Sequence, residues 1–322
     1  MLKLEKIEKV NNVNYLLLSD SNDFTTDYVS IELEKRGLEY LRLNRDLLPN
    51  FKITWNICNQ NLLIESNEDR YLIENDSLLG VYYRAPTYLR ETFIKNKSTE
   101  DQLKQSQWMS FYRNLLCFDN ARWINSPSAT FYAENKMIQL KLAKEIGFKI
   151  PQTILANNSE HIESLGDPVI IKSLDTAIFT INEYEAFVYT NSVSHDELKK
   201  SKLSIAPAII QENLISKIDY RVTVIGNTVL SVKILNKGQG VMGDWRKEKD
   251  DVNFISCELP APVNYMCCEI VKKLGLSFGA IDLIFYKNEF YFIEINPTGE
   301  WAWLVDSAGQ KIYEYICDYM VS

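Results

Sequence analysis

Three oxygen-bearing side chains, Asp282, Glu294 and Asn296, interrupt an otherwise apolar stretch near the end of the chain. The runs 280–286 and 290–296 are otherwise apolar, and a short polar segment separates them. This pattern predicts two β-strands joined by a three-residue turn, because short apolar runs on either side of a polar turn are typical of a hairpin. Carboxylate and amide oxygens at these positions could hold a metal ion.

The expected pairing of the two strands places the carboxylates together. With a three-residue turn, Tyr286 pairs with Phe290, and counting back puts Asp282 opposite Glu294. Opposed residues have Cβ atoms about 5 Å apart, and Asn296 faces the same side because the pleat repeats every second residue. Two carboxylates at that distance repel each other unless a cation lies between them. Mg²⁺ fits, since it binds one or two carboxylates together with phosphate oxygens; the alternative is a solvated face of an edge hairpin.

Bulk composition limits the other classes of function. The chain has 322 residues, 46% hydrophobic residues and a net charge of -8, which is typical of a soluble globular protein. A negative chain is a poor match for coating nucleic acid, which needs a basic surface. There is no run of 18 apolar residues and no signal-like start, so we expect a cytoplasmic protein that does not enter a membrane.

Cysteine and histidine usage narrows the chemistry further. The six cysteines show no C-x-x-C spacing, and the two histidines, His161 and His195, are far apart in the sequence. We therefore expect reduced thiols, and we disfavour a zinc site or a histidine-dependent nucleophile. The chemistry must depend on carboxylates, lysines, arginines and a bound ion.

The first 120 residues or so alternate between strand-like and helical patterns. An apolar run at 13–18 precedes a helical pattern that ends at Gly37, further strand-like runs follow, and a second helix is expected at 100–117. This alternation predicts an α/β module. A strand at 78–86 delivers Arg84, which could bind a substrate carboxylate or fasten the module internally; both alternatives stay open.

Two lysines stand out in the next part of the chain. The segment 126–147 predicts one helix that carries Lys136 in its first half, and 167–174 predicts a buried strand with Lys172 near its end. A lysine in a buried strand is costly unless its ammonium group meets an anion or reaches solvent. A further strand is expected at 185–193.

The glycines at 238–243 match the dinucleotide-binding pattern G-x-G-x-x-G. That fingerprint must open an apolar helix after a strand, whereas here the polar and charged segment 244–253 follows. We interpret 238–243 as a mobile loop that delivers Arg246, and not as a Rossmann site. The sequence G-x-x-x-x-G-K-[ST] of a P-loop does not occur.

The residues that could do chemistry occur in an order that resembles the ATP-grasp ligases. In those enzymes a helix lysine, a strand lysine, a Q-E hinge, a D-x-R segment, a strand Asp and a terminal E-x-N follow one another. The corresponding residues here are Lys136, Lys172, Gln211, Glu212, Asn213, Asp219, Arg221, Lys233, Arg246, Asp282, Glu294 and Asn296. The resemblance extends from about Ser126 to the end of the chain.

Within that superfamily the chain is similar to the microviridin-type peptide macrocyclases, the graspetide ligases. The segments that carry the similarity are VYYRAPTY, AFVYTNSVS, QENLISKIDYRVTVIG and FIEINPTGEWAW. The sequence departs from many ATP-grasp enzymes after the strand lysine, where KSLDTAIF contains no glycine.

The resemblance implies a three-module α/β fold, the ATP-grasp fold with an N-terminal α/β (pre-ATP-grasp) domain. The expected domains are 1–124 for that N-terminal domain, 125–208 for the central ATP-grasp domain, and 209–322 for the C-terminal domain with the Mg-ATP site.

The resemblance also implies a set of nucleotide-binding residues. Lys136 and Lys172 would neutralise the α- and β-phosphates, and Lys233 would belong to the same site. The segment from Gln211 to Leu214 would present backbone groups to adenine, and Glu212 would reach the exocyclic amine of adenine. Asp219 would contact the ribose or the substrate.

For catalysis, the resemblance implies that Arg221 and Arg246 stabilise the γ-phosphate and then an acyl phosphate. Asp282, Glu294 and Asn296 would hold one or two Mg²⁺ ions. Arg84 is the candidate substrate contact, and the residues do not identify a general base. Trp301 and Trp303 fit core packing better than a platform for a peptide.

The function implied is an ATP-dependent ligase that activates Asp or Glu side chains of a ribosomal precursor peptide as acyl phosphates. Ser, Thr or Lys side chains of the same peptide then form esters or amides. The resemblance further implies recognition of a leader segment and a homodimer. Two alternatives stay open: a RimK-like ligase that adds free amino acids to a protein or small-molecule carboxylate, and a non-catalytic, nucleotide-binding regulatory protein.

Overall fold

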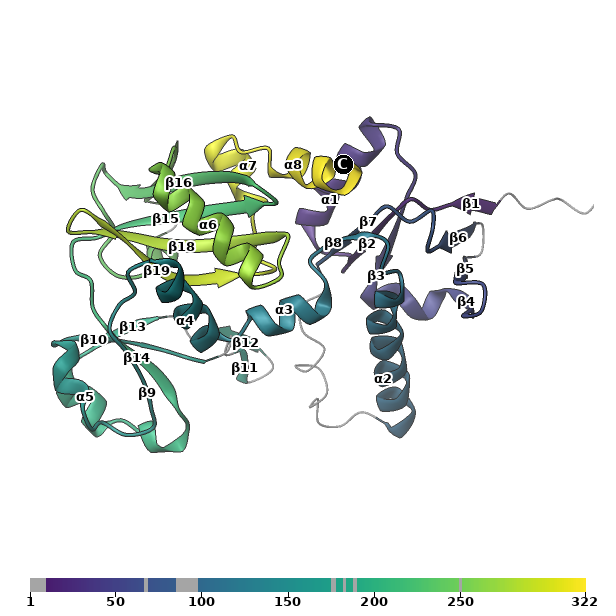
Figure 1. Cartoon of the computed structure of the whole chain (residues 1–322). Coiled ribbons are helices and arrows are strands. Elements are labelled where there is room, and N and C mark those ends of the chain that lie inside the picture. Colours follow the sequence, from purple (N-terminus) through teal and green to yellow (C-terminus); the bar gives the residue numbers. More distant parts are fainter. Residues whose placement is uncertain are drawn as a thin grey trace, which may run out of the picture. The chain divides into compact units, whose positions relative to one another are not determined.

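The structure is a computed structural model that describes residues 10–66, 69–84, 98–174, 178–181, 184–187, 190–248 and 251–322. These residues divide into two compact units (Figure 1). The first unit contains the chain up to Phe131 together with Glu300–Ala302 and Lys311–Ser322. The second contains Tyr132–Gly299 and Trp303–Gln310.

A four-stranded parallel sheet with the order β3-β2-β7-β8 organises the first unit. Every residue of β2 is buried, as expected for a parallel strand that is covered on both faces. Helices α1 and α8 pack against each other beside this sheet. The bounds are β2 (Tyr15–Ser19), α1 (Phe24–Lys35), β3 (Tyr40–Asn44), β7 (Gly80–Tyr83), β8 (Arg122–Ile124) and α8 (Ile312–Val321).

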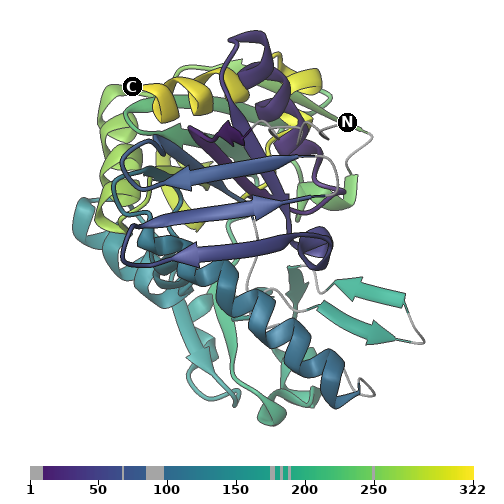
Figure 2. The ribbon, with the colours of Figure 1, turned by 90° about the vertical axis from the view of Figure 1, so that its right-hand side faces the viewer.

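A second sheet of the first unit, with the order β1-β6-β5-β4, is visible in Figure 2 together with the long helix α2. The expected α/β character of this region and its helix at 100–117 are confirmed, since α2 runs into a short 3-10 turn. The bounds are β1 (Val10–Asn12), η1 (Arg45–Asn50), β4 (Lys52–Asn56), β5 (Asn61–Glu65), β6 (Arg70–Glu74), α2 (Thr99–Asn114) and η2 (Leu115–Cys117).

The second unit contains a four-stranded antiparallel sheet with the order β13-β10-β14-β9 and a two-stranded hairpin of β11 and β12. The strand expected at 185–193 is instead two strands, β12 and β13, and residues 188–189 between them lie outside the described residues. The bounds are β9 (Thr153–Ala156), η3 (Ile162–Leu165), β10 (Val169–Lys172), β11 (Ile178–Ile181), β12 (Tyr184–Phe187), β13 (Asn191–Val193), α5 (His195–Lys200), η4 (Leu203–Ile205) and β14 (Ala208–Glu212).

A five-stranded antiparallel sheet with the order β17-β16-β15-β18-β19 forms the rest of the second unit. Helix α6 packs on β15, β16 and β18, and helix α4 packs on β19. The bounds are β15 (Ile218–Ile225), β16 (Thr228–Asn236), η5 (Trp245–Glu248), β17 (Val252–Cys257), α6 (Ala261–Lys273), β18 (Phe278–Tyr286), β19 (Glu289–Asn296) and α7 (Trp303–Ala308).

The helix expected at 126–147 is wrong as a single element. The structure has two helices, α3 (Pro127–Ala133) and α4 (Lys136–Ile146), and Gly147 ends the second with a φ of 114°. Asn135 occupies the N-cap position of α4, where asparagine is favoured over a helix interior. Lys136 is therefore the first residue of a helix, and it stands at the helix end that carries the positive pole of the macrodipole.

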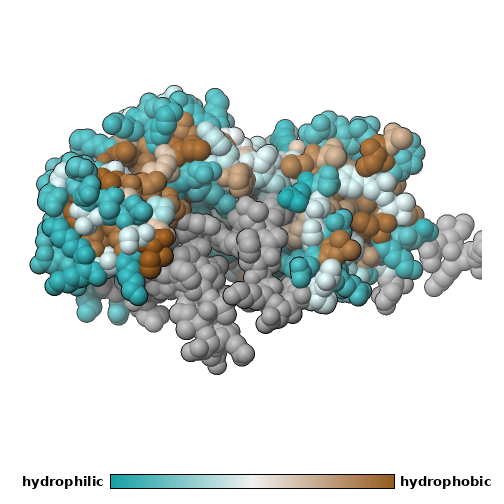
Figure 3. Space-filling model, turned by 90° about the horizontal axis from the view of Figure 1, so that it is seen from below, coloured by the Kyte–Doolittle hydropathy of each residue, from teal (hydrophilic) through white to brown (hydrophobic). Residues whose placement is uncertain are grey.

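The surface in Figure 3 shows apolar residues in separate patches among polar residues. Among the helices of the described ranges, none is long and apolar enough to cross a membrane. All six cysteines are free thiols, as the sequence predicts.

Asp23 ties the start of α1 to Arg84. Its Oδ1 accepts a hydrogen bond of 3.0 Å from the N–H of Thr25, and its Oδ2 lies 3.3 Å from Nε of Arg84. Burial acts to raise the pKa of Asp23, but Arg84 and hydrogen bonds from the hydroxyls of Thr25, Ser19 and Thr26 outweigh it and lower the pKa to about 2. Arg84 also pairs with Glu300.

We expect Asp23→Asn to lower the free energy of unfolding at pH 7 by at most about 2 kcal/mol, because asparagine keeps the cap but loses the ion pair. A depressed folded-state pKa contributes stability that is present above pH 4 or so and is lost as the pH falls toward about 2. The variant should therefore show a shallower loss of stability over that window in urea titrations. Equal slopes for wild type and variant would contradict this; Asp196→Asn, at an exposed aspartate of α5, is the control.

Candidate active site

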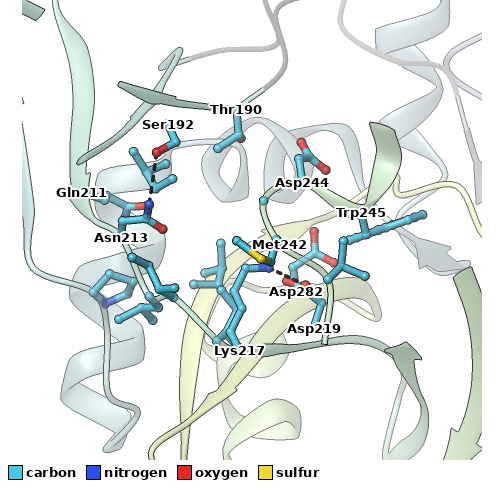
Figure 4. A pocket seen from close by; sticks show the side chains of 18 of the residues that line it. Thr190, Ser192, Gln211, Asn213, Lys217, Asp219, Met242, Asp244, Trp245 and Asp282 are labelled. Carbon is cyan, nitrogen blue, oxygen red and sulfur yellow. Dashed lines mark hydrogen bonds and ion pairs between the residues drawn. The ribbon is translucent and has the colours of Figure 1, made fainter. Parts of the chain in front are cut away.

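A cavity of about 550 Å³ lies in the second unit between its two larger sheets. One wall comes from β10 and β14 with the segment that follows β14, and the other comes from β15, β18 and β19. Residues 241–246, in the connection between β16 and β17, form a third side. Figure 4 shows Asp219, Asp244 and Asp282 at one side of this cavity, and Gln211 and Asn213 at the other.

The hairpin of β18 and β19 places two carboxylates together. Asp282 pairs with Glu294, as predicted, although the predicted turn is wrong. Tyr286 pairs with Glu289, and the turn is Lys287 and Asn288, whose φ angles of 48° and 63° are those of a two-residue hairpin turn.

A bulge restores the predicted pairing. The register shifts between Asp282 and Leu283, because Leu283 pairs with Phe292 and Ile293 is the extra residue of β19. The turn is one residue shorter than expected and the bulge adds one residue, so the two differences cancel at Asp282.

Cations surround the two carboxylates. Arg221 Nη1 lies 3.1 Å from a carboxylate oxygen of Asp282, and Lys136 Nζ lies 3.4 Å from one of Glu294. Burial raises the pKa of Asp282 despite Arg221. Burial acts in the same direction on Glu294, but Lys136, Lys172 and Arg246 outweigh it and hold the pKa of Glu294 well below its usual range. Each carboxylate therefore has one cation close to it.

The donor set fits a hard divalent cation. Glu294 and Asn296 are two residues apart on β19 and face the same side, and Asp282 is directly opposite Glu294. No group of three or more His, Cys, Asp or Glu side chains forms a metal cage within the described ranges. Mg²⁺ does not need such a cage, because it takes one or two carboxylates and completes its shell with phosphate and water. The assignment of these three residues stays a prediction.

Arg221 and Lys172 are suited to an anionic ligand. Arg221 is 8% exposed, and within the described structure its Nε and Nη1 make no hydrogen bond, although Nη1 is close to Asp282. Buried guanidinium donors without acceptors are costly, and a phosphate oxygen would satisfy them. Burial lowers the pKa of Lys172, and Lys136 and Arg246 lower it further against the attraction of Glu294.

The predicted adenine hinge, residues 211–214, spans the end of β14 and the start of the segment after it, at the other side of the cavity. Gln211 donates a hydrogen bond of 2.9 Å to the hydroxyl of Thr153, and Asn213 donates one of 3.1 Å to Ser192. Glu212 accepts a 3.0 Å bond from the backbone N–H of Gln152. Gln211, Glu212, Asn213 and Leu214 all line the cavity.

Asp219 lines the cavity beside the hairpin of β18 and β19. It forms an ion pair with Lys217, which the sequence interpretation did not single out. Burial raises the pKa of Asp219, and the nearby carboxylates of Asp282 and Asp244 add to this effect against Lys217.

Two predicted residues lie elsewhere. Lys233 on β16 pairs with Tyr220, the neighbour of Arg221, so it points to the opposite face of the sheet from Arg221. The cavity lining among the described residues does not include Lys233. Arg84 belongs to the first unit, where Asp23 and Glu300 hold it, and the segment 85–97 after it lies outside the described residues.

The two tryptophans that follow β19 have different surroundings. Trp301 is fully buried in the first unit, and its indole N–H donates a 3.2 Å bond to the hydroxyl of Tyr82. Trp303 is half-buried in the second unit, where it packs on Trp245 and Phe254, with the guanidinium of Arg221 6.0 Å from its ring.

The loop at 238–243 does not open a Rossmann helix. It leads into the 3-10 turn η5 and then into strand β17, so the sequence-based rejection of a dinucleotide fingerprint is confirmed. A Cβ at Gly240 would lie 1.7 Å from the carbonyl oxygen of Lys217. Only glycine permits this close approach, which brings the loop against the segment before β15.

Gln139 on α4 is a positioning residue that the sequence interpretation missed. β19 is an edge strand, and the Gln139 amide pairs with its backbone at Ile295, between Glu294 and Asn296. Oε1 accepts from the N–H of Ile295 at 3.0 Å, and Nε2 donates to its carbonyl at 2.9 Å. Nε2 also donates to the carbonyl of Ala133 at 2.6 Å. The one feature of the sequence that could have indicated this contact is a polar glutamine on the face of α4 that carries Leu140.

We expect Gln139→Leu to lower the free energy of unfolding by about 2–4 kcal/mol, because three backbone groups lose their partner in a buried site. The Mg²⁺ concentration that half-saturates activity should also rise, since β19 carries the proposed ligands. Urea denaturation and a metal titration measure the two effects. Lys141→Ala, at a residue of α4 with a 73% exposed side chain, is the control; a Gln139→Leu variant as stable as this control would contradict the assignment.

No protein-family model matches the sequence, and a search of curated proteins returned no match. Among solved structures, the chain is similar to a RiPP-associated ATP-grasp ligase from Chryseobacterium gregarium, in complex with ADP and a leader and core peptide. The sequence identity is 26%, the TM-score is 0.82, and the match covers 97% of this chain and 96% of the other.

Two more solved structures are similar. Macrocyclase MdnC from Microcystis aeruginosa MRC, bound with precursor peptide MdnA, matches with 21% identity, a TM-score of 0.79 and coverage of 95% and 99%. ATP-grasp ligase PsnB, complexed with a phosphomimetic variant of minimal precursor, Mg and ADP, matches with 17% identity, a TM-score of 0.76 and coverage of 97% and 98%.

These findings define the class: the chain has the mixed α/β fold of the ATP-grasp ligases over nearly its whole length. Within that superfamily it resembles the graspetide-type ligases, as its sequence motifs predict.

Proposed function

We propose that this protein is an ATP-dependent ligase that joins side chains within a ribosomally made precursor peptide. One observation carries the proposal: Asp282 and Glu294 face each other at the wall of a cavity, with Lys136, Lys172, Arg221 and Arg246 around them. Such a set of charges suits a metal-bound polyphosphate, because the carboxylates take the cation and the lysines and arginines take the phosphate oxygens.

Asp282, Glu294 and Asn296 would hold Mg²⁺, and Mg²⁺ bound there would neutralise the phosphates of ATP during transfer. Lys136 and Lys172 would bind the phosphates further from the reacting carboxylate, and residues 211–214 would bind adenine. In support, related ligases have been solved with ADP and Mg.

Arg221 and Arg246 would act on the transferred group. Phosphoryl transfer to an Asp or Glu side chain of the peptide needs positioned cations more than covalent help from the protein. Both guanidinium groups can stay in place while the acyl phosphate forms and reacts. The sheets around the cavity would limit hydrolysis by excluding water.

A hydroxyl of Ser or Thr, or an amine of Lys, in the same peptide would then attack the acyl phosphate and displace phosphate. The product is an ester or an amide. Holding both groups in one peptide makes this step effectively unimolecular, which is worth on the order of 7–11 kcal/mol when the orientation is ideal.

The proposed partner is a precursor peptide with a leader and a core. The similar ligases of known structure contain such peptides. We also propose a homodimer in the cytoplasm, and a division of the chain into domains 1–124, 125–208 and 209–322.

The test is ADP release in the presence of Mg-ATP and a candidate precursor peptide, with hydroxylamine added to trap acyl phosphate as a hydroxamate. We expect ADP and peptide hydroxamate to form together, and only when the peptide is present. Dependence on an added free amino acid would favour the RimK-like alternative. Nucleotide binding without ADP release or hydroxamate would favour a regulatory protein and contradict the proposal.

A further inference from the structure

Asp244 is a buried carboxylate of the candidate site that the assigned roles leave out. It lies between the loop 238–243 and η5, it lines the cavity, and its side chain is 4% exposed. A solvated aspartate in a polar loop would be ordinary, but one that is buried beside phosphate-binding cations needs a physical reason.

The two oxygens of Asp244 have different surroundings. Oδ1 accepts from the backbone N–H of Arg246 at 3.1 Å and from its Nε at 2.9 Å. Oδ2 is buried and makes no hydrogen bond within the described part of the chain. Oδ1 therefore orients Arg246, whereas Oδ2 is a desolvated acceptor that no protein group satisfies.

The other groups of the cavity leave few candidates for a proton acceptor. Neither His161 nor His195 lines it, Asp282 and Glu294 are the proposed metal ligands, and Glu212 accepts from Gln152 in the proposed adenine site. Asp219 and Asp244 each form an ion pair, with Lys217 and Arg246, but only Asp244 has a buried oxygen that makes no hydrogen bond within the described residues. Figure 4 shows Asp244 and Asp282 on the same side of the cavity, where the activated carboxylate would meet its nucleophile.

We propose that Oδ2 of Asp244 accepts the proton that the nucleophile loses when it attacks the acyl phosphate. This inference depends on the proposed ligase function. The nucleophile's oxygen or nitrogen forms a bond to the carbonyl carbon, and the bond from that carbon to the phosphate oxygen breaks. Phosphate leaves with the electron pair, and the proton passes to Asp244 and from there to phosphate. A lysine nucleophile first loses one proton to water.

The rival explanation is that Asp244 only holds Arg246 in place. The two roles differ in the half-reaction that they affect. Arg246 is proposed to act in phosphoryl transfer, so a mere positioning role would slow formation of the acyl phosphate. A proton acceptor acts in the next step, in which a hydroxyl or amine of the peptide consumes the acyl phosphate. Hydroxylamine does not need this acceptor, because it is nucleophilic as a neutral molecule.

The experiment compares wild type with Asp244→Asn in single turnovers with Mg-ATP and precursor peptide. Asparagine retains an oxygen for Arg246 and nearly the same volume. We expect the rate of water loss from the peptide to fall about 100-fold or more, within the range of general-base catalysis. The rate of hydroxamate formation in the presence of hydroxylamine should stay within about threefold of wild type, because formation of the acyl phosphate does not use the proton acceptor.

A parallel fall of hydroxamate and water loss would overturn the proposal in favour of positioning, and unchanged water loss would overturn it outright. Asp196→Asn, at an exposed aspartate of α5, is the matched control. If Asp244→Asn is poorly folded, Asp244→Glu, which keeps the carboxylate, is compared with Asp244→Ser. The proposal then requires the ratio of the rate of water loss to the rate of hydroxamate formation to be higher in Asp244→Glu. A wild-type enzyme that forms no hydroxamate would instead refute the ligase function itself.

Discussion

Glu294→Gln should reduce turnover by about 1,000-fold or more, because the variant loses a carboxylate ligand where phosphate charge must be neutralised. It should also lower the free energy of unfolding by about 1–3 kcal/mol, since Lys136, Lys172 and Arg246, which hold the pKa of Glu294 low, lose their anionic partner. ADP release with the peptide and urea denaturation without nucleotide measure the two effects.

Asp282→Asn is the matched comparison. It should lose as much turnover, but it should cost less stability than Glu294→Gln, because burial raises the pKa of Asp282 and the site already disfavours its charge. Equal losses of stability would show that the two carboxylates are equivalent in the ligand-free protein. Retained turnover in either variant would refute the metal assignment.

Arg221→Lys should slow formation of the acyl phosphate by about 100-fold or more. Lysine keeps the charge but cannot present the planar set of donors that a guanidinium offers to phosphate and carboxylate oxygens. Arg221 is almost fully buried, and although its Nη1 is ion-paired with Asp282, its Nε makes no hydrogen bond within the described residues, so a phosphate oxygen of a ligand is a suitable acceptor for it. Hydroxamate formation in a single turnover measures this step.

The effect of Arg221→Lys on nucleotide binding should be small, because Lys136 and Lys172 remain. Lys233→Arg is a useful control, as Lys233 lies on the other face of the sheet. If Arg221→Lys forms hydroxamate at the wild-type rate, the role of Arg221 is structural, through its contacts with Asp282 and Trp303.

Local pattern was sufficient to predict the hairpin of β18 and β19. The two apolar runs located both strands, and counting from the turn brought Asp282 and Glu294 together even though the predicted turn was one residue too long. The bulge at Ile293 could not be predicted, because the run 290–296 is mostly apolar and contains no alternation that an extra residue would interrupt. The predicted pairing was right because these two errors cancelled.

The break between α3 and α4 is different, since the sequence contains a signal for it. Asn135 stands directly before Lys136, and asparagine favours an N-cap over a helix interior. The apolar spacing continues across the break and hides it.

The residues that the sequence did not reveal act through burial and long-range contacts. Asp244 looks like a solvated aspartate in a charged loop, and only the folded chain shows that it is buried. Gln139 meets Ile295 across 156 positions of sequence, and no local pattern contains that contact. The chemical residue types were therefore predictable, whereas the residues that position them were not.

The intact mass of a candidate precursor peptide, after incubation with the protein and Mg-ATP, tests the central claim most directly. We expect the peptide to lose the mass of one or more water molecules, and Glu294→Gln to leave it unchanged. A gain equal to an added amino acid, or an unchanged mass with the wild-type protein while nucleotide binds, would contradict the claim that this protein cross-links a peptide internally.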